Sequence, residues 1–185
     1  YRGMYTINEA ASIELFRGLQ RDLTKLSMGS YFAQAAEVLS QEDLPNPELL
    51  SLLLNSLHVL CAGTVPEAQV KAVFELRSAC IAGYTPDLSG CCQCGREEAD
   101  RFDILAGRLE CADHRSPDSA GIRMPLTAGI LAAMRYICFC DPKRLFSFTL
   151  GEDSLAALGG ITESYLTTQL ERGFSALDFY KSLLI

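Results

Sequence analysis

The sequence is poor in histidine and lacks the short motifs that mark several common classes of enzyme. It has 185 residues and two histidines. It contains no P-loop, no dinucleotide-binding fingerprint, no H-E-x-x-H helix and no deaminase pairing of H-x-E with P-C-x-x-C. These absences argue against nucleotide hydrolysis, zinc-protease chemistry and nucleobase deamination. We therefore expect a protein without catalytic activity.

Long apolar runs are also missing. No stretch approaches the length of a membrane span, and no charged segment followed by an apolar one opens the chain. Neither membrane insertion nor secretion is therefore indicated. The eight cysteines, several of which metal binding explains better than disulfides, favour a reducing cytoplasm. Because the first residue is Tyr1 and not methionine, we expect the chain to be part of a longer protein.

Positive charge is scarce. The formal net charge is −7 and no segment is basic, which disfavours tight electrostatic binding of nucleic acid by this chain alone. A short basic stripe occurs at Arg17, Arg21 and Lys25, spaced four residues apart. It is interpreted either as a solvated helix face paired with Glu14 and Asp22 or as a DNA-facing surface.

What the sequence does contain is a pair of metal-binding hooks. Cys91 and Cys94 form a C-x2-C hook followed by Gly95, and Cys111 and His114 form a C-x2-H hook after sixteen intervening residues. Each hook supplies two zinc ligands from one tight turn, so the four side chains predict one structural Zn²⁺ with tetrahedral coordination. Gly95 suits the positive φ that often follows the second thiolate.

The segment between the hooks predicts a small β-hairpin. Residues 101–105 and 108–111 flank Ala106-Gly107, so that the second hook is carried back to the first. The alternatives are free surface thiols or, less favoured, a disulfide. Cys92 could replace Cys91 as a ligand, although C-x2-C spacing favours Cys91. The remaining cysteines lie in apolar helical contexts and are interpreted as buried small hydrophobes: Cys61, Cys80, Cys138 and Cys140.

The rest of the chain shows helical periodicity. Apolar residues recur at three- and four-residue steps from Ala10 to about Ser40. Asn46 and Pro47 open a helix that is apolar over much of its circumference and is expected in the core. Thr64 is expected to cap the next helix, and Thr127 a later one. Gly159-Gly160 predicts a kink or break in the helix that contains them.

The predicted fold is therefore an all-α helical bundle with an inserted zinc ribbon. We expect four parts: a terminal strand of another domain at 1–8, the first half of the bundle at 9–86, the ribbon at 87–122 and the second half of the bundle at 123–185. Residues 123–125 are interpreted as a linker.

The order of these motifs resembles one family, the bacterial recombination mediator RecO. The resemblance rests on the order of the helical bundle and the C-x2-C-G hook and on five short sequence segments: 23–26, 45–50, 73–77, 82–86 and 175–179. The resemblance covers nearly the whole chain. It implies that residues 1–7 are the last strand of an N-terminal OB fold. In zinc-bearing relatives the second hook is usually C-x2-C. Here His114 stands at its last position, which makes the site about one charge less negative.

The resemblance implies a role in recombinational DNA repair. RecO-like proteins anneal complementary strands and, with RecR, help to load RecA onto single-stranded DNA coated by single-strand-binding protein. The tail of that coat protein is acidic and ends in apolar residues, so its receptor should pair an apolar pocket with cations. We expect the receptor on the helix from Pro66 to Gly83, with Phe74 as a wall and Lys71 or Arg77 as the cation. The alternative is that these residues are ordinary core with a Lys71–Glu75 surface pair.

Two other classes of function stay open at this point. A zinc-ribbon interaction adaptor would share the hooks but not the order of helical motifs. A zinc hydrolase or thiol-redox enzyme would need an exchangeable ligand or a reactive thiol, for which Cys92 is the candidate. Four protein ligands leave no open position for an activated water, which disfavours the hydrolase.

Overall fold

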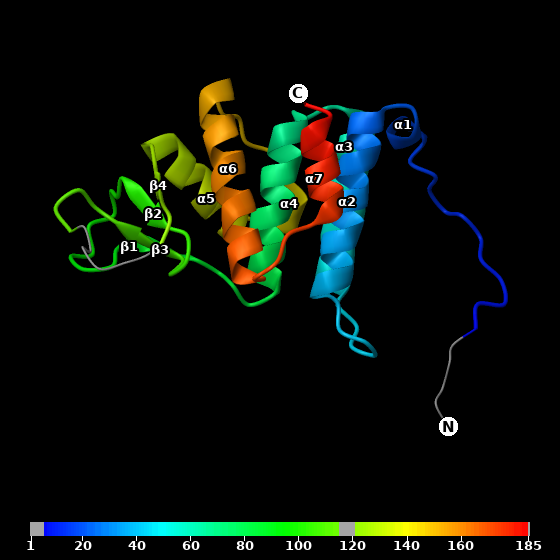
Figure 1. Ribbon diagram of the computed structural model, residues 1–185, viewed down its shortest axis with the longest axis horizontal. Helices are drawn as coiled ribbons and strands as arrows, with labels where there is room; N and C mark the ends of the chain where they lie inside the picture. Colours follow the sequence, from blue (N-terminus) through cyan, green and yellow to red (C-terminus); the bar gives the residue numbers. More distant parts are fainter. Residues whose placement is uncertain (1–5, 115–120, 185) are drawn as a thin grey trace.

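The computed structural model describes residues 6–114 and 121–184 and confirms a helical bundle with an inserted ribbon (Figure 1). Within those residues the helices are α1 (Arg17–Gln20), α2 (Leu23–Leu39), α3 (Pro47–Ala62), α4 (Glu67–Ile81), α5 (Ala128–Phe139), α6 (Glu152–Gln169) and α7 (Ser175–Ser182), with a 3-10 turn at Pro142–Arg144. The strands are β1 (Asp87–Cys91), β2 (Arg101–Asp103), β3 (Arg108–Glu110) and β4 (Arg123–Pro125). The sheet lies at one end of the molecule, beyond α5 and α6.

Helix α4 is the centre of the bundle. It packs against α3, α6, α5 and α2, and in Figure 1 it lies between α6 on one side and α7 and α2 on the other. Ten of its fifteen residues are buried, including Phe74, whose ring stacks on Phe32 at 4.3 Å between centroids. The sequence predicted that α3 belongs in the core, and α3 does contribute Leu49, Leu52 and Leu60 to it. Helix α3 buries one face, while Leu50 and Leu54 on another are 56% and 46% exposed.

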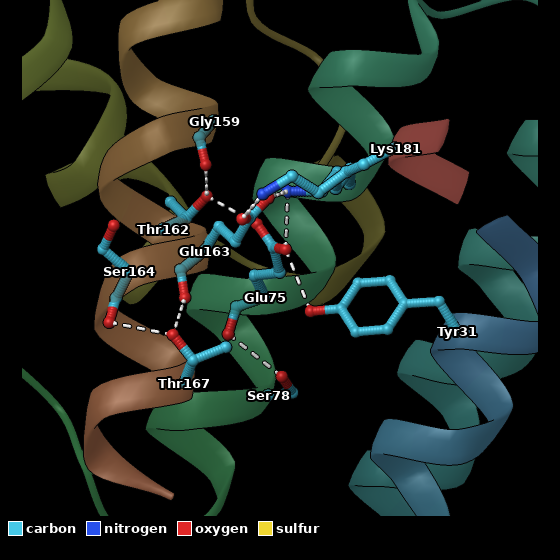
Figure 2. Close-up of polar contacts among 10 residues, drawn as sticks. Tyr31, Glu75, Ser78, Gly159, Thr162, Glu163, Ser164, Thr167 and Lys181 are labelled. Atoms are coloured by element: carbon cyan, nitrogen blue, oxygen red, sulfur yellow. Dashed lines mark hydrogen bonds and ion pairs between the residues drawn. The ribbon is translucent and has the colours of Figure 1, made fainter. Parts of the chain in front are cut away.

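The central helix buries charge as well as apolar surface. Glu75 is completely buried, and its carboxylate accepts hydrogen bonds from the Tyr31 hydroxyl at 2.9 Å and from the Thr162 hydroxyl at 2.8 Å (Figure 2). Lys71 Nζ lies 2.8 Å from Glu75 Oε1 and 2.8 Å from Glu163 Oε2. Buried charges are tolerated when paired and hydrogen-bonded in this way. The network thereby ties α2, α4 and α6 together.

Several helix starts follow the expected chemistry. The Asn46 side chain accepts a hydrogen bond from the Leu49 N–H, with Pro47 in the first turn, and the Thr127 hydroxyl accepts one from the Ile130 N–H. Thr64 does not cap α4, because the residue before that helix is Pro66 and no side-chain cap forms. The caps at Asn46 and Thr127 were predictable because each involves only residues that are close in sequence, as is usual for helix capping.

Two other expectations about helices were wrong at least in part. Residues 6–16 form no helix, and α1 begins only at Arg17, after Phe16 adopts a left-handed φ of 43°. Asp22 then caps a separate helix through the Thr24 and Lys25 N–H groups. Of the kink or break expected at Gly159-Gly160, the break is absent, because α6 runs through both glycines as one helix. The expected strand at residues 1–8 falls largely on residues 1–5, outside the described part of the chain.

The ribbon is a four-stranded sheet with the order β1-β3-β2-β4. The predicted hairpin is present: β2 and β3 are antiparallel, with Phe102 opposite Leu109, and Gly107 takes a φ of 62° in the turn. β1 joins β3 in parallel, and β4 joins the outer side of β2. Residues 123–125 are thus a strand and not the linker that the sequence suggested.

No helix in the described ranges is long and apolar enough to cross a membrane.

Candidate metal centre

The two hooks meet at one end of the ribbon. The ligand atoms of Cys91, Cys94, Cys111 and His114 all lie within 4.8 Å of one another. Cys94 Sγ is 3.9 Å from Cys111 Sγ, and Cys111 Sγ is 3.2 Å from His114 Nδ1. Sulfurs at tetrahedral corners about 2.3 Å from a zinc ion are separated by roughly 3.8 Å. The donor set and its spacing therefore suit one tetrahedral metal ion.

A backbone hydrogen bond closes each of the two hooks. The Cys91 carbonyl accepts the Gly95 N–H at 2.8 Å, and the Cys111 carbonyl accepts the His114 N–H at 3.1 Å, so each hook is a closed turn. Gly95 has a φ of 71°, as the sequence predicted. The tight turns hold two ligands of each hook on the same side of the ribbon.

The turns also direct N–H groups at sulfur. Desolvation disfavours the Cys91 thiolate, but hydrogen bonds from the backbone N–H groups of Gln93 and Cys94 outweigh it and lower the pKa of Cys91 to about 6. At Cys111 desolvation and the neighbouring thiols raise the pKa, although the N–H groups of Asp113 and His114 oppose them. A bound cation would favour the thiolate at both positions.

Cys92 lies beside the cluster without joining it. Its side chain is exposed, and partial desolvation raises its pKa above the ordinary value of a thiol despite the charge of Arg108. This direction is opposite to the lowered pKa that is typical of a reactive cysteine.

A residue that the sequence did not single out fastens the ribbon to the bundle. The Arg135 guanidinium on α5 donates to the carbonyls of Leu88 at 2.8 Å, Ser89 at 3.3 Å and Glu97 at 3.0 Å. Gly90, which follows Ser89 in β1, approaches the first hook so closely that a Cβ at this position would lie 2.7 Å from the backbone oxygen of Gly95. Arg135 has no motif around it, since its role is defined only by the fold.

The three residues predicted to meet an acidic tail lie in different surroundings. Phe74 is fully buried, and Lys71 is 7% exposed within its ion pairs. The predicted Lys71–Glu75 pair forms, but inside the bundle and not on the surface. Arg77 is partly exposed and donates to the Ile137 and Cys138 carbonyls at 3.1 and 2.6 Å.

Arg77 also lines a pocket of about 270 Å³. The apolar part of its wall comes from Leu52, Ile81 and Leu145, and Glu48 is its acidic residue. The pocket therefore combines the apolar surface and the cation that the sequence had led us to expect, but only one of the three named residues contributes to it.

The basic residues Arg17, Arg21 and Lys25 do not share one helix. Arg17 is on α1, Arg21 follows that helix, and Lys25 is in the first turn of α2. Both arginines are exposed and Lys25 is partly buried. They remain near one another in sequence, but the continuous helical stripe is interrupted by the cap at Asp22.

Comparisons with known proteins match both the bundle and the ribbon. The family model described as "Recombination protein O C terminal" matches residues 20–178. A "DNA repair protein RecO" of Acetivibrio thermocellus is 31% identical over 184 residues, covering 98% of this chain and 72% of the relative. That of Syntrophotalea carbinolica is 30% identical, with 98% and 70% covered, and that of Rubrobacter xylanophilus is 34% identical over 143 residues, with 73% and 56% covered.

The family match extends across all four metal ligands and from the end of α1 into α7. The helical bundle and the ribbon with its Cys3His cluster are thus matched as one unit, in agreement with the order of motifs in the sequence. The chain belongs to the RecO family of DNA repair proteins, and it corresponds to the C-terminal region of that family.

Proposed function

We propose that this protein is a recombination mediator of bacterial DNA repair that works in the cytoplasm without catalysing a reaction. It would act with RecR to load RecA onto single-stranded DNA coated by single-strand-binding protein. The observation that carries the proposal is the family match over residues 20–178, which takes in the bundle and the ribbon together. In the full-length protein, strand annealing would depend on an OB domain, because OB folds supply the basic groove and stacking aromatics.

The metal in this proposal is one structural Zn²⁺ held by Cys91, Cys94, Cys111 and His114. Thiolate and imidazole ligands at tetrahedral spacing favour zinc over Mg²⁺ or Ca²⁺, which prefer oxygen. Four protein ligands fill the coordination shell. The ion would therefore hold the two hooks together and leave no site for substrate.

The pocket beside Arg77 is the proposed receptor for the acidic tail of single-strand-binding protein. Its apolar wall of Leu52, Ile81 and Leu145 suits the apolar end of the tail, and the Arg77 guanidinium suits its carboxylates. Lys71 and Phe74 are buried inside the bundle and do not line the pocket, so they are not proposed to contact the tail. Of the three residues named from the sequence, Arg77 alone is proposed to touch the tail.

The experiment is fluorescence anisotropy with an acidic peptide that ends in apolar residues. Ser51 and Glu48 line the pocket and are exposed. Ser51→Glu should weaken peptide binding about tenfold by adding a like charge, and Glu48→Gln should strengthen it. Ser30→Glu adds the same charge at an exposed position outside the pocket lining and serves as the control. Equal affinities for all four proteins would exclude this pocket.

Direct binding to DNA should be weak. The chain carries a net charge of −7, and Arg17, Arg21 and Lys25 form its proposed DNA-facing patch. We therefore expect the protein to bind the tail peptide or RecR while failing to hold a bare oligonucleotide at near-physiological salt. Micromolar affinity for the oligonucleotide with a steep salt dependence would show that the bundle itself binds DNA.

A further inference from the structure

Two cysteines outside the metal cluster face each other where α4 and α5 end. Cys80 Sγ on α4 lies 3.6 Å from Cys138 Sγ on α5. Cys138 is 7% exposed and Cys80 is more accessible. The sequence indicated only small buried hydrophobes at these positions, because residues 58 apart give no local sign that they meet.

The two helix ends are already held together. Arg77, one turn before Cys80, donates to the carbonyls of Ile137 and Cys138. A disulfide has a sulfur–sulfur bond of about 2.05 Å, so the sulfurs need to approach by about 1.5 Å, which is within reach of side-chain rotation and a small shift of two terminal turns.

The surroundings distinguish the two thiols. The hydrogen bond between the two sulfurs lowers the pKa of Cys80, and the Thr85 side chain and the Arg77 charge act in the same direction, while burial opposes them. The hydrogen bond to Cys80, together with burial, raises the pKa of Cys138. Cys80 is therefore the better nucleophile and is also the more exposed sulfur.

We propose that Cys80 and Cys138 form a redox-active pair that hydrogen peroxide converts to a disulfide joining α4 to α5. The Cys80 thiolate attacks a peroxide oxygen, which forms a sulfenic acid and releases hydroxide. The Cys138 sulfur then attacks the sulfenic sulfur, the S–O bond breaks, and the departing hydroxide leaves as water with the Cys138 proton. The two thiols lose two electrons and two protons, and peroxide is reduced to two waters.

The position of the pair gives the bond a defined consequence. Residues 80 and 138 bracket the whole ribbon, so the closed loop contains all four metal ligands. Oxidation would join the two helices between which the ribbon is inserted and would stiffen the part of α4 that carries Arg77 and Ile81. A loop closed across 58 positions predicts a rise in Tm on the order of 10 to 15 °C, reversed by a dithiol reductant.

The test is oxidation of the zinc-loaded protein with small increments of hydrogen peroxide. Free thiols are alkylated under denaturing conditions, and the protein is digested with trypsin and chymotrypsin without reduction. Cleavage after Arg77, Tyr84, Tyr136 and Phe139 separates Cys80 from the first hook and Cys138 from Cys140. A chromogenic chelator follows zinc release. We expect a cross-linked peptide pair containing Cys80 and Cys138 before zinc is lost.

Variants make the assignment specific. Cys138→Ser should leave a Cys80 sulfenic acid that a 1,3-diketone probe traps, whereas Cys61→Ser and Cys140→Ser should leave the cross-link unchanged. Wild-type protein in guanidinium chloride should form this cross-link at least tenfold more slowly. The proposal is overturned if both cysteines stay alkylatable while the metal ligands oxidise, if Cys140 replaces Cys138 in the cross-link, or if the denatured protein forms the bond equally fast.

Discussion

The Tyr31 hydroxyl donates a hydrogen bond to Glu75 Oε1 at 2.9 Å across 44 positions of sequence, inside the bundle. The same oxygen lies 2.8 Å from Lys71 Nζ. A helix that is moderately polar in sequence thus occupies the centre of the protein, because its buried charges Lys71 and Glu75 have partners on neighbouring helices.

Removing the cation from this network should be strongly destabilising. Lys71→Met leaves the Glu75 carboxylate buried without its counter-charge, for which we expect a loss of about 3 to 5 kcal/mol in the free energy of unfolding. Denaturant titration measures the change. Lys181→Met removes a cation that is 54% exposed and should cost at most about 1 kcal/mol.

The double variant Lys71→Met, Glu75→Leu separates charge from packing. With both charges replaced by apolar groups, most of the lost stability should return. A double variant as unstable as Lys71→Met alone would mean that the specific hydrogen bonds to Tyr31 and Thr162, and not the unpaired charge, determine stability at this position.

The protein should lose stability in alkaline solution, partly through Tyr31. Burial, the Glu75 charge and the hydrogen bond to it raise the pKa of Tyr31 above its ordinary value of 10.0. Above that pH the unfolded chain releases the proton while the folded chain keeps it, so the stability contributed by this group, fully present below pH 10, falls as pH rises.

Tyr31→Phe should reduce this dependence. The free energy of unfolding, measured between pH 9 and 11, should decline less steeply by up to about 1.4 kcal/mol per pH unit. Tyr84, 40% exposed, provides the matched control Tyr84→Phe. An unchanged slope for Tyr31→Phe would show that its hydroxyl titrates alike in the folded and unfolded chains.

Metal removal should unfold the ribbon and spare the bundle. Structural zinc contributes about 10 to 16 kcal/mol of apparent binding free energy at neutral pH. Helix α4 packs directly on α2 and α6, although the apolar core continues into Leu88, Phe102, Ile104 and Leu109 of the ribbon. Cys94→Ser should abolish the single bound zinc measured by elemental analysis. Hydrogen exchange should then accelerate within residues 87–114 and stay slow in those helices.

Cys92→Ser is the control for this experiment, since Cys92 is exposed and outside the cluster. It should retain one zinc per chain and normal exchange. Retention of full zinc by Cys94→Ser, or its loss from Cys92→Ser, would require a different ligand set.

Two glycines should respond to alanine in opposite directions. At Gly90 a Cβ would lie 2.7 and 2.9 Å from the backbone oxygens of Gly95 and Arg96, so Gly90→Ala displaces the first hook. Overpacking of about 1 to 3 kcal/mol predicts a zinc affinity roughly tenfold lower or worse in chelator competition. At Gly159 a Cβ meets nothing within 4 Å, so Gly159→Ala should keep zinc and add about 1 kcal/mol of stability.

The ribbon could be predicted because its determinants are close together in sequence. Two hooks, a glycine after the first, and a hairpin turn define the metal cluster with little help from the bundle. The caps at Asn46 and Thr127 were predictable for the same reason, since each involves a donor three residues away.

The central helix could not be found in this way. Apolar content placed α3 in the core but gave no sign that α4 is the more buried helix, because Tyr31 and Glu163, which hydrogen-bond and neutralise its polar groups, are far away in sequence. The unbroken α6 has a similar origin: packing against α4 and α5 outweighs the low helical propensity of two glycines. The pocket at Arg77 and the contact between Cys80 and Cys138 likewise exist only once separate helices have met.

Arg135 binds the ribbon through three main-chain oxygens, and main-chain oxygens are the same for every amino acid. The exposed side chains at positions 89 and 97 can therefore change in evolution without altering these hydrogen bonds, provided that the local backbone keeps its path, whereas Leu88 is held by the core. The ribbon surface is free to diversify toward new partners while its orientation on the bundle is inherited unchanged. An exchange at position 135 itself has no such tolerance, because lysine cannot reproduce the planar fork that reaches all three oxygens.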